Sequence, residues 1–157
     1  MTLTAILEAV LALLPHPALL PFLGAFFGGE ETIILISMIS AGGTLSFGQV
    51  IVASYLGTLA SDALWFLFGQ RFLPWLEIKP KVKKGFTMVS SFVDKVTKGN
   101  HFLALLITKF LYGTRIIMIF YLGRERVSFK KFMKYNSIVT GVWIAVICPL
   151  GWLAGRG

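Results

Sequence analysis

The chain has 157 residues, of which 56% are hydrophobic, and its mean hydropathy is +0.79. These values are far above those of ordinary soluble domains, so the sequence predicts one integral membrane domain over residues 1–157. The formal charge is +8, but the cations flank apolar segments, which favours anionic lipid over nucleic acid as the partner. A single cysteine, Cys148, excludes an internal disulfide, and the distant His16 and His101 give no sign of a metal site.

Residues 1–20 begin with an apolar stretch that contains one charge, Glu8, and ends at Pro15. The stretch has no basic start and no cleavage site of small residues, so we do not expect a cleaved signal peptide. It is too short to span a bilayer before the proline. We predict a helix that lies at the membrane interface or against the domain.

The first membrane unit is predicted over residues 21–69, and it begins with an apolar segment that carries Glu30 and Glu31 near its middle. Glycines precede the two acids and allow a break in the helix. A broken, charged, apolar segment is typical of a re-entrant hairpin, in which irregular backbone lines a polar cavity. Alternatively, or in addition, the two acids lie at the positive N-terminal end of the second helix of this hairpin.

The segment from Gln49 to Gly69 is long enough to span a membrane and contains one charge, Asp62. Its small, polar and aromatic residues recur at helical spacing on one face, which should point into the protein: Ser54, Thr58, Ser61, Asp62, Trp65 and Gly69. The residues predicted to face lipid are Leu56, Leu59, Ala63 and Phe66. An ionisable residue in a span is a candidate functional group, although Asp62 could equally be a structural partner of Arg115 or Lys109.

Residues 70–101 are rich in Lys and Arg, and we interpret them as a basic cytoplasmic linker. Within this linker, residues 85–96 can form a short amphipathic helix. The apolar face of that helix would hold Phe86, Val89, Phe92 and Val93.

The second membrane unit is predicted over residues 102–156. Its first part, from Phe102 to Gly123, is apolar but contains Lys109 and Arg115. Each cation would cost roughly 2.5–3.5 kcal/mol at the centre of a plain membrane helix. We therefore predict a second re-entrant hairpin that turns at residues 112–114. The alternative is a single tilted helix whose two cations reach toward the interface.

A second basic patch follows at residues 124–134, and an uncharged span is predicted from Tyr135 to Ala154. One face of this span is mostly small and should allow close helix packing: Ser137, Gly141, Ile144, Cys148, Gly151 and Gly155. Each half of the chain thus holds a charged hairpin, a Ser-Phe pair and a span. The predicted fold is an all-α membrane protein with two re-entrant hairpins, each followed by a transmembrane helix, in an inverted repeat.

The sequence from about residue 20 to 156 resembles the DedA family, also known as the SNARE-associated or VTT-domain family. The resemblance rests on the following residues: Asp62, Trp65, Phe68-Gly69-Gln70-Arg71, Lys109-Phe110, Arg115, Gly123, Ser128-Phe129, Phe132, Asn136, Trp143 and Gly151, with Glu30 or Glu31 at the acidic hairpin. The chain departs from the family pattern in several places. It lacks the usual Pro-Gly before the acid, and Lys109 and Tyr112 stand where Arg and Pro are commoner. Many members also have a further membrane helix beyond the position of Gly157.

The resemblance implies a flippase for polyprenyl phosphate or phospholipid, or a lipid scramblase, in the bacterial cytoplasmic (inner) membrane. We expect Arg115, Lys109 and Tyr112 to bind the anionic headgroup. Glu30, Glu31 and Asp62 would couple transport to protons, with at least one acid protonated when the phosphate binds.

Other interpretations remain open. The same charges could serve a small-ion or proton-coupled transporter, or the chain could be a membrane assembly factor that transports nothing. A homo-oligomer is compatible with every one of these alternatives. No His, Cys or Ser constellation indicates an enzyme, and no cofactor is expected.

Overall fold

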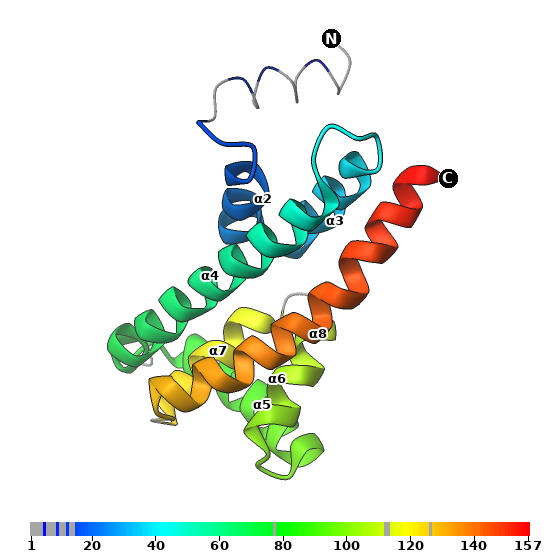
Figure 1. The fold of residues 1–157 in the computed structure, drawn as a ribbon. Helices are drawn as coiled ribbons and strands as arrows, with labels where there is room; N and C mark the ends of the chain where they lie inside the picture. Colours follow the sequence, from blue (N-terminus) through cyan, green and yellow to red (C-terminus); the bar gives the residue numbers. More distant parts are fainter. Residues whose placement is uncertain are drawn as a thin grey trace. The chain divides into compact units, whose positions relative to one another are not determined.

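The structure is a computed structural model, and it describes residues 15–76, 78–111, 114–125 and 127–157 together with Ala5, Ala9 and Ala12. Within the described residues all regular secondary structure is helical and no strand occurs, which confirms the predicted all-α class (Figure 1). The interfacial helix predicted within residues 1–20 lies mostly outside the described residues.

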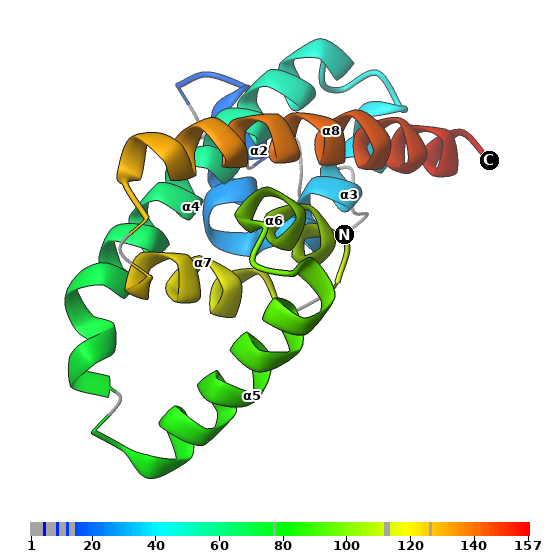
Figure 2. The same cartoon turned by 90° about the horizontal axis from the view of Figure 1, so that it is seen from below.

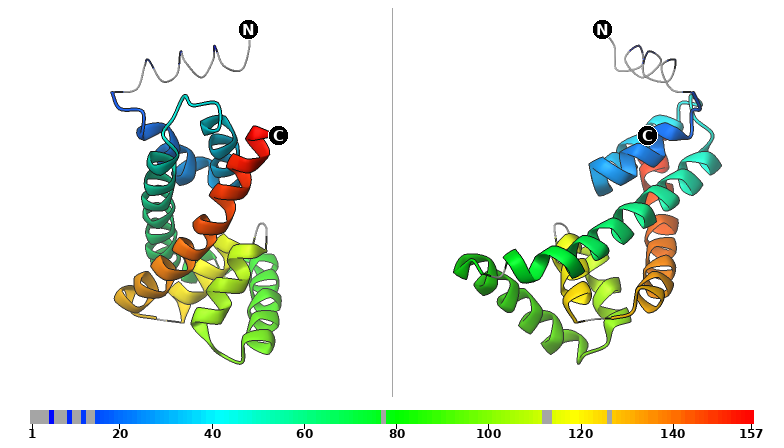
Figure 3. Two further views of the ribbon diagram at one scale, coloured as in Figure 1. Left: turned by 45° about the vertical axis from the view of Figure 1, so that its right-hand side comes forward. Right: turned by 90° about the vertical axis from the view of Figure 1, so that its left-hand side faces the viewer.

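The chain divides into two compact units. The first contains residues 1–58 and 144–157, and the second contains residues 59–143. Two long helices, α4 (Phe47–Leu76) and α8 (Phe129–Arg156), each contribute residues to both units and are continuous in every view (Figure 3).

The first unit contains a helical hairpin made of α2 (Leu19–Leu23), the π-helical segment η1 (Gly24–Gly28) and α3 (Gly29–Ser40). The chain reverses at Gly29, whose φ of 71° is readily adopted only by glycine. A Cβ atom added at Gly24 would lie 2.8 Å from Ile36 Cδ1. In a straight helix these two residues would be about 18 Å apart. The predicted break before the acids is therefore confirmed, and both Glu30 and Glu31 lie in the first turn of α3.

Glycines allow α4 and α8 to approach this hairpin closely. A Cβ atom at Gly57 of α4 would lie 2.3 Å from the carbonyl oxygen of Phe22. A Cβ atom at Gly155 of α8 would lie 2.2 Å from the carbonyl oxygen of Met38. The close packing predicted for the small face of α8 is thus confirmed at Gly155 and at Gly151, which packs against α3.

The second unit is built around α5 (Pro80–Thr97), α6 (His101–Phe110) and α7 (Arg115–Arg124), which contact one another (Figure 2). The Asn100 side chain caps α6 by accepting hydrogen bonds from the backbone N–H groups of Phe102 and Leu103. Helices α6 and α7 have 10 residues each. Each is therefore about 15 Å long, half of the roughly 30 Å hydrocarbon core of a bilayer.

Two details of the sequence interpretation are corrected. Phe66 does not face lipid; it is fully buried and stacks on Phe132 of α8, with ring centroids 4.1 Å apart. The amphipathic helix begins at Pro80 rather than at residue 85, because proline suits the first position of a helix. Of the residues predicted on its apolar face, Phe86 and Val93 are buried, but Phe92 is 60% exposed.

By length and composition alone, three segments could cross a membrane: Leu19–Ser40, Phe47–Phe72 and Phe129–Arg156. The first of them folds back on itself at Gly29. The polar face predicted for α4 does point inward, because Ser54, Thr58, Ser61 and Asp62 are all buried. The insertion of the two hairpins as re-entrant loops, and their relation by an inverted repeat, stay predictions.

Candidate functional site

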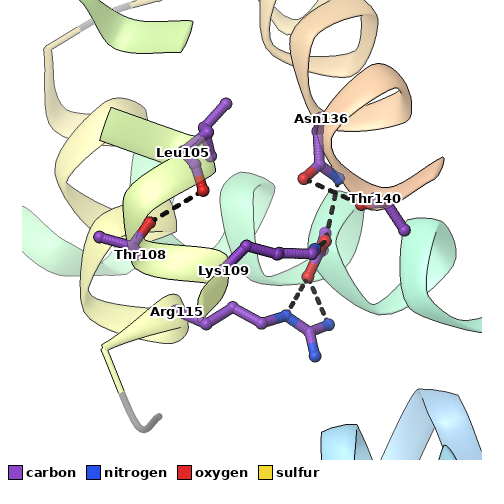
Figure 4. A network of polar contacts seen from close by, with 7 residues as sticks. Leu105, Thr108, Lys109, Arg115, Asn136 and Thr140 are labelled. Carbon is purple, nitrogen blue, oxygen red and sulfur yellow. Dashed lines mark hydrogen bonds and ion pairs between the residues drawn. The ribbon is translucent and has the colours of Figure 1, made fainter. Parts of the chain in front are cut away.

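Two cationic side chains of the second unit, Lys109 and Arg115, converge on Asp62, which lies on α4 and is fully buried. One carboxylate oxygen, Oδ2, accepts hydrogen bonds from Lys109 Nζ at 2.7 Å and from Asn136 Nδ2 at 2.9 Å. The other oxygen, Oδ1, accepts a 2.7 Å bond from Arg115 Nε and also pairs with Arg115 Nη2. A single carboxylate therefore receives donors from α6, α7 and α8 (Figure 4). We call these four residues the Asp62 cluster.

The break between α6 and α7 allows both cations to reach Asp62. Lys109 lies in the last turn of α6, and Arg115 is the first residue of α7. In one continuous helix, residues six positions apart would point about 120° away from one another. Arg115 also lies at the positive end of α7, where a cation is unfavourable unless an anion lies close to it. Asp62 supplies that anion.

Asn136 is a member of the cluster that the sequence interpretation did not place in the site. Its side chain is fully buried, and its Oδ1 accepts a 3.5 Å hydrogen bond from the Thr140 hydroxyl one turn later on α8. A carboxylate can only accept, so the amide NH₂ group must face Asp62. The signal in the sequence was a polar pair at helical spacing, Asn136 and Thr140, inside an otherwise apolar span.

The Asp62 cluster carries an excess of positive charge. With all groups ionised, Asp62 contributes −1 and Lys109 and Arg115 contribute +1 each, so the sum is +1. The side chains of Lys109 and Asp62 are 3% and 0% exposed, whereas that of Arg115 is 12% exposed. Among the residues that the structure describes, no protein group bonds to Arg115 Nη1. Arg115 is therefore the member that can present N–H donors to an incoming anion.

The other predicted site residues lie in the first unit or outside the described residues. Tyr112 lies outside the described residues. Glu30 and Glu31 belong to the first unit, where Glu30 is half-buried with its Oε1 atom buried and Glu31 is exposed. Their predicted role in coupling stays a prediction. In the described part of the chain, no group of three or more His, Cys, Asp or Glu side chains could hold a metal ion.

Comparisons of the sequence with known proteins identify its family. A family model for the VTT domain matches residues 14–153. The inner membrane protein YohD of Escherichia coli (strain K12) is 23% identical over 137 residues, which cover 85% of this chain and 68% of that protein. No solved structure matches the chain.

The expected location in a bacterial inner membrane is confirmed by this relative together with the three apolar helical segments. The family match covers most of the sequence, including every member of the Asp62 cluster. The chain therefore belongs to the VTT-domain, or DedA, family of membrane proteins.

Proposed function

We propose that this protein is a membrane lipid transporter of the flippase or scramblase type. Its substrate is an anionic lipid, such as a polyprenyl phosphate or a phospholipid. The observation that carries the proposal is the Asp62 cluster, in which two cations share one buried carboxylate and Arg115, 12% exposed, keeps Nη1 without a bonded group among the described residues. An apolar tail and an anionic headgroup are the two properties that such a site in a membrane protein selects.

Arg115 is the headgroup ligand in this proposal. Its guanidinium already uses Nε and Nη2 on Asp62, which fixes the plane of the group before any substrate binds. The remaining N–H groups then face a phosphate without a further loss of side-chain freedom. Lys109 lies deeper and contributes positive charge more than direct contact.

The two helical hairpins give the lipid a route. We propose that α2–η1–α3 and α6–α7 enter the bilayer as re-entrant loops from opposite faces, as inverted repeats do in transporters. Short helices that end inside the membrane leave a thin barrier, and their irregular turns are compatible with a polar cavity. Protonation of Asp62, or of Glu30 and Glu31, would couple the passage of the anion to protons.

The test is reconstitution into liposomes, with the translocation of fluorescent phosphatidic acid, phosphatidylglycerol, a polyprenyl phosphate and phosphatidylcholine measured across a pH series. We expect faster translocation of at least one anionic lipid than of phosphatidylcholine, and little acceleration by Arg115→Lys protein. Proton or ion flux without lipid translocation would instead support an ion transporter. No flux of any kind in correctly inserted protein would contradict transport.

A further inference from the structure

A second feature of the α5–α7 unit lies beside the Asp62 cluster. The structure has a cavity of about 270 Å³ between α5 and the end of α6. Its walls include Met88, Phe92 and Val96 of α5, Ile107 of α6, and Leu111 and Thr114 after it. Thr114 directly precedes Arg115, so the cavity reaches the backbone that carries the proposed headgroup ligand.

Among the described residues that line the cavity, the only polar side chains are three threonines, and each of their hydroxyl protons is used on the backbone. The Thr97 hydroxyl donates a 2.8 Å hydrogen bond to the carbonyl oxygen of Val93, and the Thr108 hydroxyl donates one of 2.8 Å to that of Ala104. The Thr114 hydroxyl donates a 2.8 Å bond to the carbonyl oxygen of Leu111. Because each hydroxyl is occupied by its own backbone, the walls present carbon, which suits a hydrocarbon chain and not a sugar or a peptide.

We infer that this cavity binds a hydrocarbon chain of the same lipid whose phosphate binds Arg115. This inference rests on the proposed function and adds a tail-binding site to it. The occupant follows from the arrangement of charge: an apolar cavity that ends beside a cluster of net charge +1 matches a molecule with a chain attached to an anion. Three wall residues, Met88, Phe92 and Val96, are exposed on α5, so the chain can enter from the side.

The experiment uses the full chain in phosphatidylcholine nanodiscs and measures binding of ethyl, butyl, hexyl and octyl phosphate by calorimetry, with empty nanodiscs subtracted. Burial of the chain should raise the affinity by up to about fourfold for each added methylene group. Val96→Trp fills the cavity from an exposed position, so we expect it to flatten this dependence and leave ethyl phosphate binding unchanged. Met88→Trp tests the same wall independently if Val96→Trp folds poorly.

The matched control is Leu103→Trp, because Leu103 is also exposed and apolar but does not line the cavity. It should retain the dependence of the wild-type protein on chain length. A full chain-length dependence in both cavity variants would overturn the tail site while leaving Arg115 as a headgroup ligand. If no member of the series bound, or if Arg115→Lys had no effect on ethyl phosphate, the headgroup site itself would fail, and the tail site with it.

Discussion

Lys109 Nζ donates a 2.7 Å hydrogen bond to Asp62 Oδ2 where both side chains are almost completely buried. Arg115 binds the other oxygen of the same carboxylate, so one anion serves two cations that come from separate helices. Asp62 therefore connects α4 with α6 and α7, and it also neutralises part of the positive charge of the two cations.

The first prediction concerns stability. Asp62→Asn should lower the free energy of unfolding by about 3–5 kcal/mol, because it removes the buried carboxylate that both Lys109 and Arg115 bind. The double variant Asp62→Asn with Lys109→Met should recover part of this loss, since it also removes one of the two buried cations that Asp62 binds. The measurement is denaturant-induced unfolding in detergent.

Asp94→Asn is the matched control for this prediction. Asp94 is exposed and accepts a 2.7 Å hydrogen bond from the Tyr121 hydroxyl, so its loss should cost only about 1 kcal/mol. An equal loss in the free energy of unfolding for Asp62→Asn and Asp94→Asn would contradict this prediction.

A second prediction separates two glycines that both lie inside helices. Gly57→Ala should destabilise the first unit, because the new Cβ atom would lie 2.3 Å from the Phe22 carbonyl oxygen and the hairpin would have to move. Gly85→Ala meets no atom within 4 Å and should stabilise α5 by about 0.5–1 kcal/mol. Thermal unfolding of the two variants in one detergent would compare them, and a stable Gly57→Ala protein would contradict the close approach of α4 to α2.

Much of the site could be predicted from the sequence because helical spacing alone places side chains on a face. The inward direction of Ser54, Thr58 and Asp62 followed from their separation along one helix. The break between Lys109 and Arg115 followed from the cost of two cations in one apolar segment. Asp62 was predicted either as a functional acid or as a structural partner of Arg115 or Lys109, and in the structure it binds both cations.

What could not be predicted depends on contacts between distant parts of the chain. Phe66 is apolar like its neighbours, and nothing in its own helix indicates that it stacks on Phe132 instead of facing lipid. The role of Asn136 required knowing that α8 passes beside Asp62. Within one helix several apolar or polar positions look equivalent. Contacts with distant helices decide which of them is buried or joins the site.

A third prediction concerns orientation. Residues 1–70 contain no Lys or Arg, whereas residues 71–101 and 124–134 contain seven and five, twelve of the 15 in the chain. The positive-inside rule places both basic segments in the cytoplasm if α6–α7 is re-entrant. In a Cys148→Ala background, Lys83→Cys and Lys131→Cys, which replace exposed residues, should react with an impermeant thiol reagent from the cytoplasmic side only. Opposite accessibility of the two would mean that residues 102–123 cross the bilayer.

A fourth prediction concerns the acids of the first hairpin. If an acid must hold a proton when the phosphate binds, transport should be faster at low pH and fall as the pH rises. Changing both Glu30 and Glu31 to Gln mimics the protonated form permanently and should flatten this profile. Gln49→Glu, an exposed substitution at the start of α4, is the control and should leave the profile unchanged. A pH profile unaltered by the double substitution would remove both acids from coupling.

The central claim is that the Arg115 guanidinium holds the phosphate of the transported lipid. The most direct measurement is anionic lipid translocation by Arg115→Lys protein in liposomes, with folding checked by thermal unfolding. Lysine keeps the charge beside Asp62 but loses the fork of donors, so translocation should fall about tenfold or more while the unfolding temperature changes little. Arg156→Lys, at an exposed arginine that lies over the Trp152 ring, should translocate at the wild-type rate. Full translocation by a folded Arg115→Lys protein would contradict the claim.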